Sequence, residues 1–197
     1  MSHTTARLPE AVVFDVDGVL VDSEPVHADA YCRVFNDMGF DIDREGYYNE
    51  ITRGSLDVRD LYAKLGGDMA VWEQVVARKH VMAGQMLREQ IGLLPGVRDL
   101  LDSLRESQVR MAVATAAGGR SVGEIIDVFG LHDYFEHVVT WYDVKASKPD
   151  PEVYLVAAQR LGVPPEHCAA IEDSPRGLQA ALSAGMKCVV VPTQTTA

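Results

Sequence analysis

Five short apolar runs along the chain predict buried strands. Each run is rich in Val, Ile or Ala, and together they cover residues 11–14, 109–114, 137–140, 168–171 and 187–191. A short run that is apolar at successive positions is typical of a strand covered on both faces, as in a parallel sheet.

From residue 93 onward these strands alternate with stretches whose apolar residues recur at i, i+3, i+4 and i+7, the spacing of one helix face. The regular stretches are Val97, Leu100, Leu101 and Leu104; Val122, Ile125, Ile126 and Phe129; and Leu178, Ala181, Leu182 and Gly185. Residues 153–161 follow the pattern less regularly. The alternation predicts right-handed crossovers and an α/β fold with a parallel, Rossmann-like sheet.

Capping residues mark the ends of these helices. Asp150 and Ser174 each precede a proline, which predicts an N-cap followed by proline at the first helical position. Ser121 with Glu124 fits a capping box. Glycines fall at or near the helix ends, at positions 130, 162 and 185, where a left-handed cap favours them.

The first strand breaks this rhythm. About 80 residues separate Phe14 from the helix at Val97, far more than one crossover requires. The interval has helical spacing of its own, with further helical stretches near residues 58–65 and 72–87 and one stripe made by Tyr31, Val34, Phe35 and Met38. We therefore predict a small α-helical cap domain at residues 20–92, inserted into an α/β catalytic core made of residues 1–19 and 93–197.

The charge of the chain restricts its partners. The 197 residues are 47% hydrophobic and 24% charged, as in a compact globular protein. Eighteen Lys and Arg stand against 29 Asp and Glu, giving a net charge of −11, which repels nucleic acid and anionic membranes at long range. We expect no nucleic-acid or membrane partner, and a monomer or weak homodimer.

Cysteine usage and the absence of long apolar runs indicate a compartment. The cysteines Cys32, Cys168 and Cys188 are odd in number and are expected to be reduced. The N-terminus has no apolar signal core, and no run approaches the roughly 18 apolar residues of a membrane span. These features predict a soluble cytoplasmic protein.

Chemically active side chains follow the predicted strands. They are Asp15 and Asp17 after the first strand, Thr115 at the end of the second, Lys148 in the loop after the third, and Glu172 and Asp173 after the fourth. In an open parallel sheet, ligands bind beyond the carboxyl ends of the strands. Four carboxylates at one edge would repel each other unless a cation lies among them, and an all-oxygen site suits Mg²⁺.

The same edge predicts an anion site. Lys148, the Thr115 hydroxyl and the N–H groups of the glycine-bearing segment after it match a phosphoryl group. A metal, an anion cradle and an aspartate together indicate phosphoryl transfer. In this reading Asp15 is the nucleophile that forms an aspartyl-phosphate, and Asp17 protonates the leaving oxygen and later activates water.

Four segments in this order, "FDVDGVLVDSEP", "VATAAGG", "SKPDPEVY" and "IEDSPRG", resemble the motifs of the haloacid dehalogenase superfamily, in its phosphatase and β-phosphoglucomutase-like branch. The resemblance implies that the backbone carbonyl of Asp17 binds Mg²⁺ with Asp15 and Asp173, helped by Glu172 directly or through water. It also implies phosphoryl binding by Thr115, Lys148 and the neighbouring Ala116, and a helical cap that closes over a small phosphorylated metabolite.

One departure from the family lies at the end of the chain. After Val191 the sequence offers only "PTQTTA", whereas relatives usually continue with another strand and helix. We expect a shortened core with an exposed sheet edge.

Simpler readings stand beside several candidates. Asp15 and Asp17 could form an ordinary turn, and Glu172 could be favoured by a helix dipole alone. His27 and Arg53 are candidate substrate-binding residues of the insertion, with an exposed hinge as the alternative for His27. Arg78 and Lys79 are interpreted as a solvated helix face.

The sequence thus predicts a Mg²⁺-dependent phosphatase acting on a sugar phosphate or a phosphoglycolate-like compound. The nearest alternative is a phosphohexomutase of β-phosphoglucomutase type, which would need a second phosphate site. A non-enzymatic phosphoaspartate signalling module is the alternative from another class. In such a module the phosphorylated aspartate would follow a strand in the middle of the sequence, whereas Asp15 follows the first strand.

Overall fold

A computed structural model describes residues 8–51, 56–117 and 119–191 of the chain, which folds as two compact units. One unit comprises residues 1–22 and 92–197, and the other comprises residues 23–91. The first is an α/β unit and the second is entirely helical in its described part.

The α/β unit contains the predicted five-stranded parallel sheet, in the order β3-β2-β1-β4-β5. The strands are β1 (Ala11–Phe14), β2 (Arg110–Ala114), β3 (His137–Val139), β4 (Cys168–Glu172) and β5 (Lys187–Val190). Each predicted strand is present within one or two residues, and the fold class is confirmed. β1 lies at the centre of the sheet, where its residues are almost completely buried.

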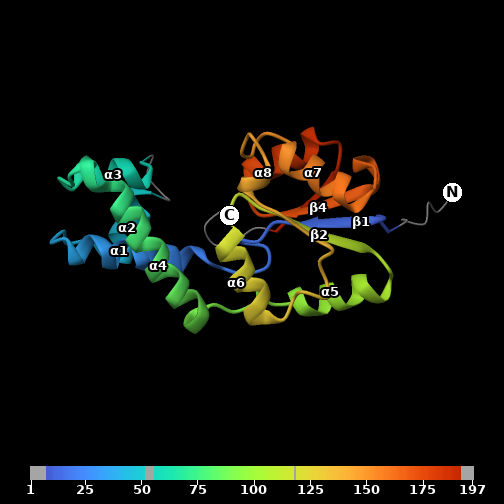
Figure 1. Ribbon diagram of the computed structural model, residues 1–197, viewed down its shortest axis with the longest axis horizontal. Coiled ribbons are helices and arrows are strands. Elements are labelled where there is room, and N and C mark those ends of the chain that lie inside the picture. Colours follow the sequence, from blue (N-terminus) through green and yellow to red (C-terminus); the bar gives the residue numbers. More distant parts are fainter. Residues whose placement is uncertain (1–7, 52–55, 118, 192–197) are drawn as a thin grey trace. The chain divides into compact units, whose positions relative to one another are not determined.

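Helices cover both faces of this sheet. Helices α7 (Glu152–Leu161) and α8 (Pro175–Ser183) lie on one side, and α5 (Val97–Glu106) and α6 (Gly119–Phe129) lie on the other (Figure 1). The core under α7 and α8 is rich in alanine, with Ala112, Ala114 and Ala170 contributed by the strands. Two short 3-10 helices, η2 (Trp141–Asp143) and η3 (Pro165–His167), complete the described elements of this unit.

The predicted caps are only partly correct. Ser174 caps α8 as expected, because its hydroxyl accepts a hydrogen bond from Gly177 N at 3.1 Å. Pro151 takes the N-cap position of α7, one residue later than predicted, but Asp150 still binds the start of the helix, because its Oδ1 accepts a hydrogen bond from Glu152 N at 2.9 Å. Ser121 is not a cap, since α6 already begins at Gly119.

The helical unit consists of α1 (Glu24–Asp37), α2 (Arg44–Glu50), α3 (Val58–Lys64), the 3-10 helix η1 (Met69–Val71) and α4 (Trp72–Gln90). Aromatic rings dominate its core. Phe35 and Trp72 each pack on Tyr62 with ring centroids 5.4 Å apart. Such contacts are favourable beyond the area that they bury.

β5 forms one edge of the sheet, and its valines are exposed: Val189 by 56%, Val190 by 44% and the following Val191 by 37%. The expected exposed edge is therefore present. The three cysteines are unpaired, as predicted. Among the described residues, no helix combines the length and the apolar character that crossing a bilayer requires.

Candidate active site

The parallel register of the sheet brings the predicted residues to one edge. Phe14 at the end of β1 pairs with Val113 of β2 and with Ile171 of β4, so the three strands end together. Asp15 continues β1 for one more residue, and its N–H donates to Ile171 O at 3.0 Å. Because β1 is flanked on both sides, the Asp15 side chain emerges in the middle of this edge.

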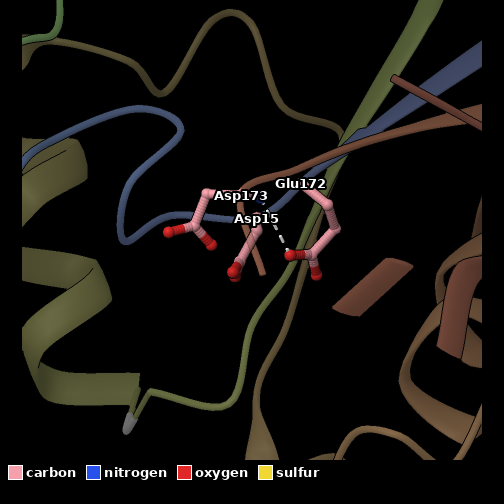
Figure 2. A group of neighbouring side chains, drawn as sticks. All are labelled: Asp15, Glu172 and Asp173. Carbon is pink, nitrogen blue, oxygen red and sulfur yellow. Dashed lines mark hydrogen bonds between the residues drawn. The ribbon is translucent and has the colours of Figure 1, made fainter. Parts of the chain in front are cut away.

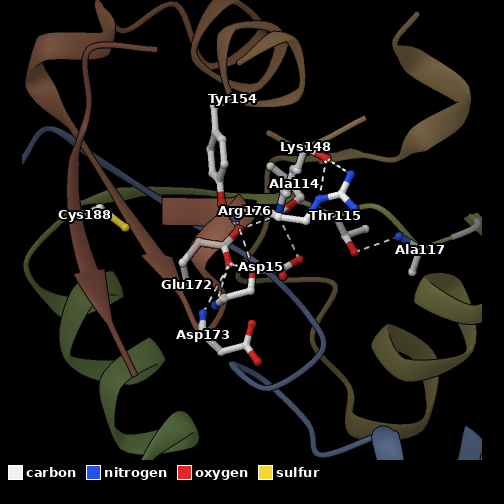
Figure 3. Close-up of polar contacts among 12 residues, drawn as sticks. Asp15, Ala114, Thr115, Ala117, Lys148, Tyr154, Glu172, Asp173, Arg176 and Cys188 are labelled. Atoms are coloured by element: carbon white, nitrogen blue, oxygen red, sulfur yellow. Dashed lines mark hydrogen bonds and ion pairs between the residues drawn. The ribbon is translucent and has the colours of Figure 1, made fainter. Parts of the chain in front are cut away.

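Lys148 lies between two of the acids (Figure 3). Its Nζ is 2.6 Å from Glu172 Oε1 and 3.2 Å from Asp15 Oδ1, and it also donates to Ala114 O at 3.0 Å. The lysine is only 6% exposed, so these contacts replace the water that a free ammonium would bind. The prediction that Lys148 and Asp15 share a site agrees with this geometry.

Glu172 is completely buried and receives donors on both carboxylate oxygens. Oε1 accepts from Lys148 Nζ at 2.6 Å and from the Tyr154 hydroxyl at 2.5 Å. Oε2 accepts from Asp173 N at 3.2 Å, Ser174 N at 3.5 Å and Ser174 Oγ at 3.2 Å. Burial raises the pKa of Tyr154, with the Glu172 charge adding to the effect, so the phenol keeps its proton and acts as the donor.

Two glycines make room for these carboxylates. Gly18 has a φ of +74°, and a Cβ built there would lie 2.1 Å from Asp173 Oδ2. A Cβ at Gly177 would lie 1.9 Å from the carboxyl carbon of Glu172. Both glycines of the "DVDG" and "SPRG" segments are therefore required by close approach of a side chain.

Asp15 has an incompletely satisfied carboxylate. Its Oδ1 is buried and accepts no hydrogen bond, although Lys148 Nζ lies within ion-pair distance. Burial raises the pKa of Asp15 to about 7, while Lys148 opposes the shift and Glu172 and Asp17 add to it. A buried, under-coordinated oxygen of this kind is suited to meet an electrophile or a cation.

The residues at this edge fit a divalent cation. Asp15, Glu172 and Asp173 each offer an oxygen within 4.8 Å of the others, and Figure 2 shows these three side chains together. Burial raises the pKa of Asp173 to about 6, with Glu172 as the next cause, so a cation would relieve the charge of both aspartates. Three hard oxygen donors suit Mg²⁺. Asp17 adds no carboxylate to this group, and metal binding by its backbone carbonyl stays a prediction.

The predicted phosphoryl-binding residues lie at the end of β2. Thr115 is 1% exposed, and its hydroxyl accepts a hydrogen bond from Ala117 N at 3.0 Å, which fixes the turn that follows. Figure 3 shows Thr115 and Lys148 on the same side of the group around Asp15. Ala116 is exposed, and phosphoryl binding by this residue stays a prediction.

The helical unit holds the other predicted residues. His27 of α1 is half-buried rather than exposed, and its Nδ1 lies 3.1 Å from Lys79 Nζ. Burial and then the Lys79 charge lower the pKa of His27 to about 4, so the imidazole is neutral at pH 7. Arg53 lies outside the described residues, and its predicted role stays a prediction.

The interpretation of Lys79 as part of a solvated face is wrong. Lys79 is only 6% exposed, and its Nζ lies 4.9 Å from the centroid of the Tyr31 ring. The spacing contained the signal, because position 79 is four residues from both Val75 and Ala83, which are buried on the same face of α4. Arg78 is exposed, as interpreted, and pairs with Asp37.

Tyr154 is a second residue that the sequence reasoning passed over. Tyr154 ends the segment "SKPDPEVY", and the resemblance gives it no role of its own. Its contact with Glu172 joins residues 18 positions apart, so no local pattern could reveal it.

Comparisons with known proteins agree with this geometry. A family model described as haloacid dehalogenase-like hydrolase matches residues 9–185. Hexitol phosphatase B of Escherichia coli (strain K12) is 35% identical over 191 residues, which cover 96% of this chain and 86% of that protein.

Two solved structures are similar over most of the chain. A variant of CbbY from Rhodobacter sphaeroides in complex with xylulose-(1,5)bisphosphate has a TM-score of 0.81 and 30% identity, covering 96% of this chain and 88% of its own. A Thermotoga maritima protein solved under a provisional β-phosphoglucomutase name has a TM-score of 0.77 and 31% identity. The match covers 94% of this chain and 88% of that one. These matches confirm the predicted resemblance and fold.

Proposed function

The chain belongs to the haloacid dehalogenase-like hydrolases and is a phosphoric monoester hydrolase of that family, and we propose that it hydrolyses a small sugar or sugar-alcohol phosphate through an aspartyl-phosphate on Asp15. The observation that carries the proposal is the buried Asp15 carboxylate, which has an oxygen without a hydrogen bond and Lys148 Nζ at 3.2 Å. The names of the relatives support the substrate class: one is a hexitol phosphatase, and one was solved with a ketose bisphosphate.

In the proposed first step, an oxygen of Asp15 attacks phosphorus and the bond to the ester oxygen breaks. Asp17 gives a proton to the departing alkoxide. Lys148 and Thr115 hold the non-bridging oxygens, whose charge the lysine offsets. In the second step, Asp17 takes a proton from water, the water oxygen attacks phosphorus, and the bond to Asp15 breaks to release inorganic phosphate.

Asp15 and Asp173 would hold Mg²⁺ in this site, with Glu172 close by and the Asp17 carbonyl as a further ligand. When bound, Mg²⁺ would neutralise phosphate charge and keep Asp15 ionised near neutral pH. The helical unit would act as a cap, with His27 and Arg53 as candidate contacts for the part of the substrate that leaves.

A phosphohexomutase is the second candidate, and it is favoured by the similarity to the Thermotoga maritima protein. A mutase would return the phosphoryl group from Asp15 to a second hydroxyl of the sugar instead of to water. The two activities share every residue discussed above, so they differ in the fate of the phosphoryl group.

The test is a screen of hexitol, hexose and pentulose phosphates, together with p-nitrophenyl phosphate, in the presence of Mg²⁺. We expect release of inorganic phosphate, and a loss of at least about 1,000-fold in Asp15→Asn, which removes the nucleophile. Interconversion of hexose phosphates without free phosphate would assign the mutase. Full turnover by Asp15→Asn would contradict both.

A further inference from the structure

We propose that Tyr154 is a positioning residue for phosphoryl transfer, which acts through Glu172 to hold the Lys148 ammonium beside Asp15. The inference rests on the proposed function, because it assumes that Asp15 and Lys148 handle the phosphoryl group. It assigns a role to a residue that touches neither of them by a hydrogen bond.

The geometry forms a chain of three side chains (Figure 3). The Tyr154 hydroxyl donates to Glu172 Oε1 at 2.5 Å, and the same oxygen accepts from Lys148 Nζ at 2.6 Å. The Lys148 ammonium also lies over the face of the Tyr154 ring, with Nζ 5.0 Å from the ring centroid. Tyr154 and Glu172 are both completely buried, so water does not substitute for a missing donor at low cost.

The lysine is shared between two acids that compete for it. Nζ forms a hydrogen bond with Glu172 but only an ion pair with Asp15, at 3.2 Å. A second donor on Glu172 Oε1 reduces the pull of that oxygen on the ammonium and fixes its direction. Without the Tyr154 hydroxyl, Oε1 would draw Lys148 further from Asp15 and from a phosphoryl group in transfer.

The remaining contacts of Glu172 explain why it acts as an anchor. Its other oxygen accepts from the backbone N–H groups of Asp173 and Ser174 and from the Ser174 hydroxyl, at the start of α8. Gly177 leaves the space in which the carboxylate lies. One oxygen of the acid is thus fixed to the start of α8, and the other is shared by Tyr154 and Lys148.

The test compares Tyr154→Phe with Tyr62→Phe in the full chain with Mg²⁺. Tyr62 is equally buried, and its hydroxyl makes only a long contact of 3.5 Å with Asp68 O in the helical unit, so the control makes the same chemical change elsewhere. For Y154F we expect kcat to fall about tenfold, the usual scale for a residue that orients a catalytic group, with KM nearly unchanged. The inhibition constant of orthovanadate, a mimic of phosphorus in transfer, should rise by the same factor.

A double-mutant cycle separates positioning from a merely structural role. If Tyr154 acts through Glu172, the variant carrying both Y154F and Glu172→Gln is no slower than E172Q alone. The concentration of Mg²⁺ for half-maximal activity stays at the wild-type value in Y154F. The proposed route would be overturned if the rate losses of the two single variants multiplied in the double variant. It would also be overturned if Y154F needed tenfold more Mg²⁺ for half-maximal activity.

Folding is measured for every variant by circular dichroism and urea unfolding, and rates are given per folded molecule. If Y154F does not fold, E172Q tests the same route, with lower kcat and weaker orthovanadate binding expected. Wild-type kcat in a folded Y154F would overturn the inference while leaving the proposed function intact. Loss of the proposed function itself would appear as full activity in Asp15→Asn.

Discussion

Each unit of the molecule buries a lysine, and the two lysines have different surroundings. Lys148 in the α/β unit and Lys79 in the helical unit are both 6% exposed. Lys148 lies between the carboxylates of Asp15 and Glu172, whereas the contacts of Lys79 include the His27 imidazole and the face of the Tyr31 ring.

The difference concerns what each cation does to its neighbours. Lys148 favours the ionised form of Asp15 and opposes the effect of burial on that carboxylate. Lys79 disfavours protonation of His27 and adds to the effect of burial on that ring. One lysine thus stabilises a negative charge needed for chemistry, and the other keeps a neighbouring base neutral.

The largest expected effect comes from removing the first lysine. In Lys148→Met we expect turnover to fall at least about 1,000-fold, because the charge that faces the phosphoryl oxygens is lost. The variant should also lose about 3 kcal/mol of unfolding free energy, since Glu172 stays buried without its cation. Phosphatase assays and urea unfolding measure the two effects.

Lys145→Met is the matched control for that variant. Lys145 lies in the same loop but is exposed, so the substitution should change neither quantity appreciably. Equal losses in the two variants would show that the loop, and not the buried ion pair, determines the result.

A smaller loss is expected at Gly177. In Gly177→Ala the new Cβ would collide with the Glu172 carboxylate and displace it, and Lys148 with it. We expect turnover to fall about tenfold or more and stability to fall by about 1–3 kcal/mol. Steady-state kinetics and thermal unfolding measure these losses.

Gly123→Ala on α6 makes the same change where a Cβ meets nothing within 4 Å. It should keep activity and gain up to about 1 kcal/mol, because alanine favours the helix. Wild-type behaviour in Gly177→Ala would contradict the close approach described for Glu172.

The other half of the comparison predicts a pH dependence. The pKa of His27 is lowered from 6.5 to about 4, so the folded protein binds fewer protons than the unfolded chain in this range. Neutral His27 therefore stabilises the fold above pH 6.5, and this contribution is lost as the pH falls toward 4. Between pH 7 and pH 5, wild type should lose roughly 2 kcal/mol more than His27→Gln in urea unfolding.

The Lys79→Met variant sharpens this prediction. The Lys79 charge is the second cause of the shift after burial, so its removal should move the pKa of His27 upward, as followed by NMR. An unchanged His27 titration would mean that the Lys79 charge does not contribute to the shift.

The smallest effect is expected at the sheet edge. Val189 of β5 is 56% exposed, so Val189→Lys should change stability by no more than about 0.5 kcal/mol. It should lower self-association at high concentration, because a charge on an edge strand opposes pairing with another chain. Sedimentation velocity would detect this, and a large loss of stability would contradict the exposure.

The strands and helices of the α/β unit could be predicted from the sequence, because each follows from a simple spacing of apolar residues. Five buried strands and their crossovers followed from apolar runs and helical spacing, and a parallel sheet then requires that Asp15, Thr115 and Asp173 meet at one edge. Lys148 was predicted from its motif and from its place in the loop after the third strand, and its position beside Asp15 agrees with that prediction.

Side-chain direction and burial of charge could not be predicted in the same way. Lys79 was assigned by its charge, although its place on the apolar stripe of α4 decides its burial. Tyr154 of α7 meets Glu172 of β4 only through the packing of the helix on the sheet, which no local sequence pattern specifies. Asp150 accepts from the N–H of Glu152 as a cap would, but α7 begins one residue later than its sequence predicted.

The space kept open by Gly177 offers a criterion for sorting other sequences of this fold. A homologue could retain every acidic residue and the lysine, yet carry a larger residue at the corresponding place in the helix. Such a protein would keep the architecture but work poorly as an enzyme, so that single residue would identify a pseudoenzyme.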